Sequence, residues 1–462
     1  MPKLLIIGLD CAEPSLVFER WLHDLPNLAR LMRQGTYGLL ESCIPAITVP
    51  AWSCMMSGRD PGELGIYGFR NRSNRSYQSM TIANSQAVRV PRLWNLLSDA
   101  GWQCAVIGVP GTYPPQPLNG AMVSCFLAPS TSAEYTYPPG LAAQVRAWVG
   151  NYLLDVPDFR SDDKERILRD IYTLGDQRFL VAERLLEQNH PDMLMLVEMG
   201  VDRLHHAFWR HMDPTHPLHV PDSPFAQAIH DYYVHVDQHI GRLMAYGDDQ
   251  TVVLVVSDHG ARPLMGGVCI NDWLRAEGYL TLRELPPVPV PLEQAQVDWG
   301  RTRAWGAGGY YGRIFLNVQG REPEGVIPIP AYEQERQALA EKLRAMPGPD
   351  GHPLGNRVFT PQHIYRRVRG IAPDLVVYFG DLAWRSVGKV GMETLYPLEN
   401  DTGPDDANHA QHGLFILHDP QRPGGGQRLE GVQLYDILPT LLARYGITPP
   451  DGLRGRVIAG EW

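Results

Sequence analysis

The stretch Leu4-Leu5-Ile6-Ile7-Gly8-Leu9-Asp10 decides the fold of this chain. The apolar run is too short for a buried helix, and its unbroken pattern is typical of a parallel strand covered on both faces. Asp10 follows the run directly, and ligands of open α/β sheets bind beyond the carboxyl ends of the strands. A carboxylate at this position is either a helix N-cap or a metal ligand, and this stretch alone leaves both open.

Strand-like and helix-like segments alternate outward from this strand. Residues 104–108, 193–197 and 251–256 repeat the buried-strand pattern, while 164–188 and 224–246 have apolar positions at helical spacing. The alternation predicts an α/β fold with a doubly wound, mostly parallel sheet and helices on both faces. We also expect helices over 27–34, 90–100 (with Pro91 in its first turn), 332–345 and 436–445, and strands over 38–42, 315–318, 375–379 and 414–417.

Residues 262–400 interrupt this alternation, because they are rich in Pro, Gly and Trp. We expect them to form a large insertion that acts as a lid over an α/β core made of 1–261 and 401–462. Residues 128–163 also look loop-like and are expected to lie over an edge of the sheet. The 462 residues suit two or three domain-sized units or one large α/β domain with insertions.

The composition restricts partners and compartment. A formal net charge of −10 argues against a nucleic-acid polymer or an anionic membrane surface as a partner. The 6 cysteines include no C-x-x-C pair, and no apolar stretch approaches the roughly 20 residues of a membrane span. We therefore expect a cytoplasmic protein with no membrane partner.

The stretch Pro45-Ala46-Ile47-Thr48-Val49-Pro50-Ala51-Trp52 carries the candidate nucleophile, Thr48. A threonine hydroxyl is a poor nucleophile at neutral pH, and metal coordination is one of the few ways to activate it. The alternative is a loop threonine that caps the helix expected to begin near Ala51.

Five distant segments, most of them at strand ends, carry Thr48 or the candidate acidic and imidazole side chains. Asp202 and His206 are four residues apart, so one helical face would present both, and the adjacent Asp258 and His259 can reach one centre. Each residue alone has an ordinary explanation as a cap, a turn or a solvated face. Together these donors suit two divalent metal ions, Zn²⁺ with Mn²⁺ as its competitor, and paired ions suit phosphoryl transfer. The set is Asp10, Thr48, Asp202, His206, Asp258, His259 and His409.

Short motifs around these residues follow one another in a characteristic order. They are GLD ending at Asp10, PAITVPAW around Thr48, SGRDPGELGIYGF, VDRLHHAFWRHMDPTHP from Val201, SDHG at 257–260 and NHAQHGLFI around His409. The ordered set resembles the alkaline phosphatase superfamily and, within it, the type I phosphodiesterase/nucleotide pyrophosphatase family. The resemblance extends over nearly the whole chain and is weakest in 127–190 and 270–400.

The resemblance implies that Thr48 is the nucleophile between two metal sites. His409 is preferred as the last ligand because the family's histidine often lies four residues before a strand-opening glycine, here Gly413; His412 is the alternative. The implied sites are Asp10, Thr48, Asp258 and His259 for one ion, and Asp202, His206 and His409 for the other.

Substrate contacts are less well defined by the sequence. Trp52 and Arg203 are the candidates, although a surface role is the alternative for the arginine. No asparagine follows the nucleophile and Leu64 replaces a histidine common in the family, so nucleotide specificity stays open. His205, His211 and His216 are expected to be packing or structural residues.

These observations predict a metal-dependent phosphohydrolase that cleaves a phosphodiester or pyrophosphate-type bond in a small phosphate ester. The alternatives are a phosphotransferase or phosphomutase, a phosphomonoesterase of the same superfamily, and a binding module with an inactive site. Cys43-Ile44-Pro45-Ala46-Ile47 lacks the arginine of a sulfatase motif, which argues against a formylglycine enzyme.

Overall fold

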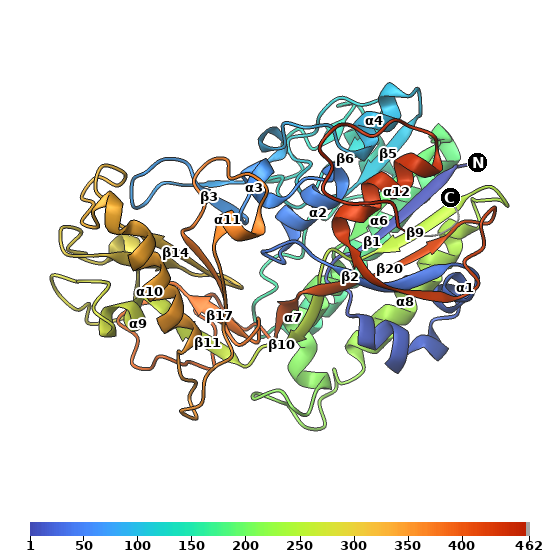
Figure 1. Cartoon of the computed structure of the whole chain (residues 1–462). Coiled ribbons are helices and arrows are strands. Elements are labelled where there is room, and N and C mark those ends of the chain that lie inside the picture. The colour runs from blue at the N-terminus through green and yellow to red at the C-terminus, as the bar shows by residue number, and fades with distance from the viewer. Residues whose placement is uncertain (459–462) are drawn as a thin grey trace.

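A computed structural model describes residues 1–458, and in that range the centre of the protein is a nine-stranded sheet. Its strand order is β21-β2-β20-β9-β1-β8-β5-β6-β7 (Figure 1). The central strand β1 (Leu4–Leu9) is fully buried and lies parallel to both neighbours, β8 (Met193–Glu198) and β9 (Val252–Val256). The other strands of this sheet are β2 (Thr36–Glu41), β5 (Cys104–Ile107), β6 (Gly120–Val123), β7 (Thr136–Tyr137), β20 (His412–His418) and β21 (Gln427–Gln433).

Helices cover both faces of this mostly parallel sheet, which confirms the predicted fold class. Figure 1 shows α2 (Thr48–Ser57) and α12 (Ile437–Arg444) on one side of β1, and α1 (Pro26–Gln34) and α8 (Ala228–Met244) on the other. The remaining helices of the core region are α3 (Pro61–Leu64), α4 (Leu93–Asp99), α5 (Leu141–Val149), α6 (Lys164–Asn189) and α7 (Gly200–Met212).

Two local predictions differ from the structure. The helix expected over 90–100 begins at Leu93, because Arg92 is extended and its N–H is bonded by the Asn95 side chain at 3.0 Å, so Pro91 precedes the helix. Residues 128–163 are not only loop, since they contain α5 and the short strand β7, which pairs with β6 at the sheet edge.

The insertion has a hydrophobic core of its own. Its four-stranded sheet has the order β13-β14-β16-β15 and lies apart from the central sheet in Figure 1. The hairpin of β3 (Arg70–Arg72) and β4 (Met80–Ile82) packs against it, because Tyr77 stacks on Trp299 with ring centroids 3.6 Å apart. That residues 262–400 form a separate insertion subdomain and act as a lid stays a prediction. Its elements are β11 (Gly266–Cys269), α9 (Ile270–Ala276), β12 (Val290–Pro291), β13 (Ala304–Ala307), β14 (Gly312–Leu316), α10 (Tyr332–Arg344), β15 (Arg357–Phe359), α11 (Pro361–Ile364), β16 (Leu375–Tyr378), β17 (Trp384–Val387) and β18 (Lys389–Val390).

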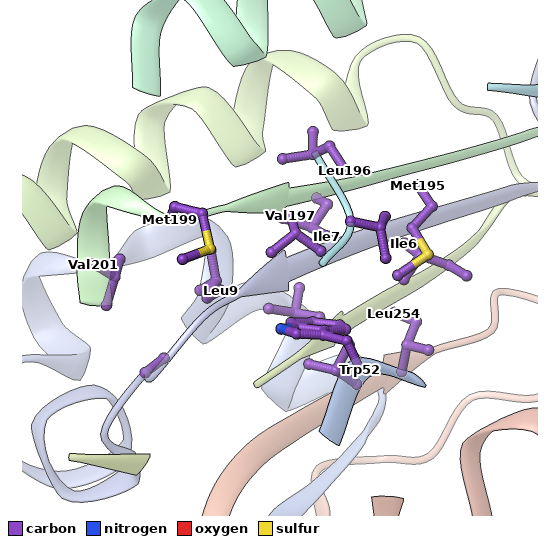
Figure 2. Close-up of a cluster of buried hydrophobic side chains, with 14 of the residues drawn as sticks. Ile6, Ile7, Leu9, Trp52, Met195, Leu196, Val197, Met199, Val201 and Leu254 are labelled. Carbon is purple, nitrogen blue, oxygen red and sulfur yellow. The ribbon is translucent and has the colours of Figure 1, made fainter. Parts of the chain in front are cut away.

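The core beneath β1 is built around the indole of Trp52 (Figure 2). Gly8 makes room for this ring, because a Cβ at that position would lie 2.5 Å from the tip of the indole. The strand and the helix α2 therefore approach each other closely, which brings Asp10, the residue after β1, near Thr48, the first residue of α2. Of the described helices, none combines the length and hydropathy that a membrane span requires.

Candidate active site

Parallel pairing of β1 with β9 brings together the acidic residues that follow these two strands. Gly8 pairs with Val256, so Asp10 and Asp258 leave the sheet side by side, and both side chains are fully buried. The backbone N–H of Cys11 donates to Asp258 Oδ1 at 3.2 Å, which ties the two turns to each other. His259 follows Asp258, with 3.1 Å between its Nε2 and Asp258 Oδ2.

The third strand, β8, contributes candidate ligands through α7, the helix that follows it. Glu198, the last residue of β8, accepts hydrogen bonds from the N–H groups of Gly200 at 2.6 Å and Val201 at 3.0 Å. These bonds satisfy the first two N–H groups of α7, whose N-cap position is Met199, and Asp202 lies in the first turn of this helix with His206 one turn later. Asp202 Oδ1 and His206 Nε2 are 3.3 Å apart.

His409 reaches the site through a separate two-stranded ribbon. It lies on β19 (Ala407–Ala410), which pairs antiparallel with β10 (Gly260–Pro263), and this places it beside the turn that carries His259. Its Nδ1 lies 3.0 Å from the carbonyl oxygen of Ala46, so a proton on Nδ1 leaves Nε2 as the free ligand atom. That Nε2 is 3.8 Å from Asp202 Oδ1. The alternative ligand, His412, is exposed on β20 opposite Glu41.

Thr48 is the first residue of α2, and Ile47 rather than Thr48 occupies the N-cap position. The alternative role as a helix cap therefore does not apply. The Thr48 hydroxyl lies 3.3 Å from His259 Nε2 and 3.5 Å from Asp10 Oδ1. The structure thus brings all seven predicted residues into one buried cluster.

The cluster has the properties of a site for cations. Its donor atoms form two groups, Asp10, Asp258 and His259 in one and Asp202, His206 and His409 in the other, and the buried thiol of Cys11 forms a third group with His259 and His409. Within the described residues, Asp202 Oδ1, His206 Nε2 and Asp258 Oδ2 are buried without a hydrogen bond. Burial and the charge of Asp202 raise the pKa of Asp10, and burial and the charge of Asp10 raise that of Asp258. Buried carboxylates that disfavour each other's charge, as Asp10 and Asp258 do, fit divalent ions well.

Several residues that the sequence did not single out support the ligands. The side chain of Asp405 is completely buried, and its Oδ1 lies 2.7 Å from His206 Nδ1. Its other oxygen accepts from Arg160 Nε at 3.0 Å. Tyr310 covers the ligands, with its ring 4.9 Å from that of His206 and 4.4 Å from that of His409. The acidic pair Asp405-Asp406 just before His409 was the only sequence signal for this support.

Both predicted substrate residues are buried and are bound to acidic side chains. Trp52 is completely buried, and its indole N–H donates to Asp10 Oδ2 at 2.7 Å, so it orients a ligand instead. Arg203 donates from Nε and Nη2 to Asp155 at 2.7 and 2.8 Å and also pairs with Asp202. His205 has the packing role expected of it, because burial lowers its pKa to about 3 and its Nε2 lies 3.3 Å from the hydroxyl of Tyr233.

A pocket of about 920 Å³ adjoins the cluster, because Ile47 and Tyr310 belong to its wall. The insertion and the β3–β4 hairpin supply much of the lining. Basic groups outnumber acidic ones, and aromatic rings form part of the surface. The lining includes Arg70, Arg72, Arg160, Arg313, Arg385 and Lys389, the acids Glu293 and Asp401, and the aromatic residues Phe69, Tyr77, Trp299, Trp305, Tyr310, Tyr311 and Phe315.

Comparisons with known proteins agree with this architecture. The model of the type I phosphodiesterase/nucleotide pyrophosphatase family matches residues 4–413. A phosphonoacetate hydrolase from Sinorhizobium meliloti 1021, solved with phosphonoformate, shares 18% identity over 97% of this chain and 96% of its own, with a TM-score of 0.60. An inactive murine ectonucleotide pyrophosphatase/phosphodiesterase 5 in complex with AMP shares 14% identity over 97% and 96%, with a TM-score of 0.55. At these identities the similarity shows the fold alone, and no curated protein sequence matches the chain.

Proposed function

The chain belongs to the type I phosphodiesterase/nucleotide pyrophosphatase family and is a hydrolase of phosphoric ester bonds, and we propose that Thr48 is its nucleophile beside two divalent metal ions. The position of the Thr48 hydroxyl carries this proposal, because it lies within 3.5 Å of Asp10 Oδ1 and 3.3 Å of His259 Nε2. Because Thr48 does not cap its helix, the fold alone does not explain why its hydroxyl lies beside an aspartate and a histidine.

The two donor groups would hold one ion each. Nitrogen and carboxylate donors suit Zn²⁺, with Mn²⁺ as the competitor. Such ions lower the pKa of a coordinated hydroxyl and polarise the phosphoryl oxygens. The first ion would be held by Asp10, Thr48, Asp258 and His259, and the second by Asp202, His206 and His409.

Thr48 acts in two displacements at phosphorus. In the first, its Oγ1 forms a bond to phosphorus while the ester bond to the leaving alcohol breaks; the hydroxyl proton goes to solvent, and the alcohol takes one up. In the second, water attacks phosphorus and the bond to Oγ1 breaks, which returns the threonine. The N–H groups of Thr48 and Val49 at the start of α2 would bind a phosphate oxygen, while Pro50 has no N–H group.

The adjoining pocket would hold the organic part of the substrate. Arg160 lines it and bonds Asp405, so the pocket and the ligand His206 share one supporting carboxylate. The Nε and Nη1 atoms of Arg385 are buried there without a hydrogen bond, although the guanidinium lies 3.6 Å from a carboxylate oxygen of Asp401 and 3.6 Å from one of Asp405. We therefore propose that a second anionic group of the substrate binds Arg385, and that residues 262–400 serve as the lid that carries it.

The decisive experiment compares Thr48→Ala with Thr48→Ser on nitrophenyl monoesters and diesters, with Zn²⁺ or Mn²⁺ added back. We expect Thr48→Ala to lose turnover while metal content, measured by elemental analysis, stays close to that of the wild type. Thr48→Ser keeps a hydroxyl and should retain part of the activity. Full turnover by Thr48→Ala rules out the covalent step, and transfer to an added alcohol in place of water identifies a phosphotransferase.

A further inference from the structure

A second cluster of metal-ligand residue types lies in the helical layer, outside the candidate active site. It consists of Asp176 on α6 and of His235 and His239 on α8. Asp176 Oδ1 is 2.7 Å from His235 Nε2 and 2.8 Å from His239 Nε2, and the two Nε2 atoms are 3.2 Å apart. Three donor atoms from two helices therefore converge on one point.

The spacing on each helix explains the convergence. His235 and His239 are four residues apart, so they lie one turn apart on the same face of α8. Because α6 packs against α8, Asp176 faces that pair. Two histidines at this spacing with a carboxylate from a neighbouring helix form a donor set that zinc accepts.

Aromatic neighbours on α6 orient both imidazole rings. Tyr172 lies against His235 with ring centroids 4.9 Å apart, and Phe179 stacks on His239 at 4.4 Å with an interplanar angle of 13°. Tyr172 and Phe179 stand four residues before and three residues after Asp176, so all three share one face of the helix. The rings are thus fixed with Nε2 toward the carboxylate, as a preformed site requires.

The donor separations match the edges of a coordination tetrahedron. With Zn–N distances of about 2.0–2.1 Å, two ligand atoms of a tetrahedral ion lie roughly 3.3 Å apart. The two nitrogens already have nearly this separation, at 3.2 Å, and the carboxylate needs to retreat by about half an ångström. A purely hydrogen-bonded cluster would instead have to direct two N–H groups at one oxygen.

We propose that Asp176, His235 and His239 bind a divalent transition-metal ion, with Zn²⁺ as the best match, and that this ion ties α6 to α8. The Asp176 side chain is 52% exposed, so water from solvent can complete the coordination. The proposal is independent of the catalytic one, since none of its residues is a candidate ligand of the active site.

The positive charge of Arg242 would repel an ion bound at this site, so removing that charge should strengthen metal binding. Its guanidinium contacts His239, and its Nε also lies 3.4 Å from Glu183 Oε1. Metal binding requires the guanidinium to leave His239, and Glu183 offers it a partner. The change Arg242→Gln removes the competing positive charge and should tighten metal binding.

The test uses the full-length protein, stripped of metal by a chelator and then titrated with Zn²⁺ against an indicator dye. We expect wild type to bind one equivalent of Zn²⁺ more than His235→Ala or His239→Ala. If the variants still bind this equivalent, their affinity for it should be lower by about 100-fold or more, because even residues that only support a metal ligand contribute about 10–100-fold to metal affinity. Zn²⁺ should also raise the thermal midpoint of wild type more than that of either variant.

The matched control is His230→Ala, because His230 lies on the same helix but bonds Asp24 and Asp231 instead. It should bind Zn²⁺ like wild type. Equal stoichiometry and affinity in wild type, His235→Ala and His239→Ala would overturn the proposal, as would an equal loss in His230→Ala. The test compares variants by a difference of one equivalent of Zn²⁺. This difference is therefore interpretable even if the candidate active site binds a different number of metal ions from the two that we propose.

Discussion

Replacing Asp405 by asparagine tests whether this carboxylate tunes a metal ligand. The Asp405 side chain is fully buried, and its Oδ1 lies 2.7 Å from His206 Nδ1. Asparagine keeps the shape and an acceptor oxygen, so the ring should stay oriented, but it removes the charge that makes the imidazole a stronger donor. Loss of such a partner typically lowers metal affinity by about 10–100-fold, or about 1.4–2.7 kcal/mol.

The assay measures metal affinity and turnover together. Competition with a chelator gives the dissociation constant, and turnover is followed as metal is added. We expect Asp405→Asn to need about 10–100-fold more free metal for half-maximal activity and to recover much of its turnover at saturation. Asp405 also pairs with Arg160, and breaking a buried pair costs about 3–5 kcal/mol of stability, so folding must be controlled.

The adjacent residue supplies this control. The side chain of Asp406 is equally buried, but its carboxylate accepts from the backbone N–H and the Nε of Arg210, and it is the backbone N–H of Asp406 that bonds the His206 carbonyl. Asp406→Asn should therefore cost stability without a selective loss of metal. If Asp405→Asn binds metal as tightly as wild type, or if the two variants lose affinity equally, the reasoning is refuted.

Three further changes test other contacts. Trp52→Phe removes the 2.7 Å hydrogen bond to Asp10 and should lower the free energy of unfolding in urea by about 1.5–3 kcal/mol; an unchanged value would contradict the positioning role. Burial lowers the pKa of His216 to about 4, and its Nδ1 accepts from the Leu218 N–H. Between about pH 6.5 and pH 4 the folded state therefore binds fewer protons than the unfolded state. Stability should therefore fall by about 3 kcal/mol through this residue as the pH drops across that window, and His216→Gln should make the measured decline correspondingly shallower. Arg385→Gln should lower the ratio of kcat/KM for an ester with a second anionic group to that for a matched neutral ester, and an unchanged ratio would place that group elsewhere.

The sequence was sufficient for the parts that local patterns encode. Continuous apolar runs predict the buried parallel strands because such strands have no solvent-facing side. The motif order predicted the family, and the spacing of Asp202 and His206 predicted a shared helical face. Predicted helix ends were wrong where a single side-chain contact decides the structure, as the bond between Asn95 and the Arg92 N–H does at the start of α4.

The support of the site depended on contacts between distant segments. Asp405 meets His206 across 199 residues, and Trp52 meets Asp10 across 42. Trp52 looked like a substrate contact because an aromatic residue beside a nucleophile is ambiguous in sequence, whereas its burial beneath Gly8 is a property of packing.

By itself the sequence determined the sheet, the family and the identity of the candidate ligands, because periodicity and motif spacing are local properties of the chain. Only the tertiary structure decided which histidine of the 409–412 segment enters the cluster, what holds each ligand in place, and that Asp176 meets two histidines on another helix. Those facts depend on strand register and helix packing, which join residues that no short stretch of sequence contains together.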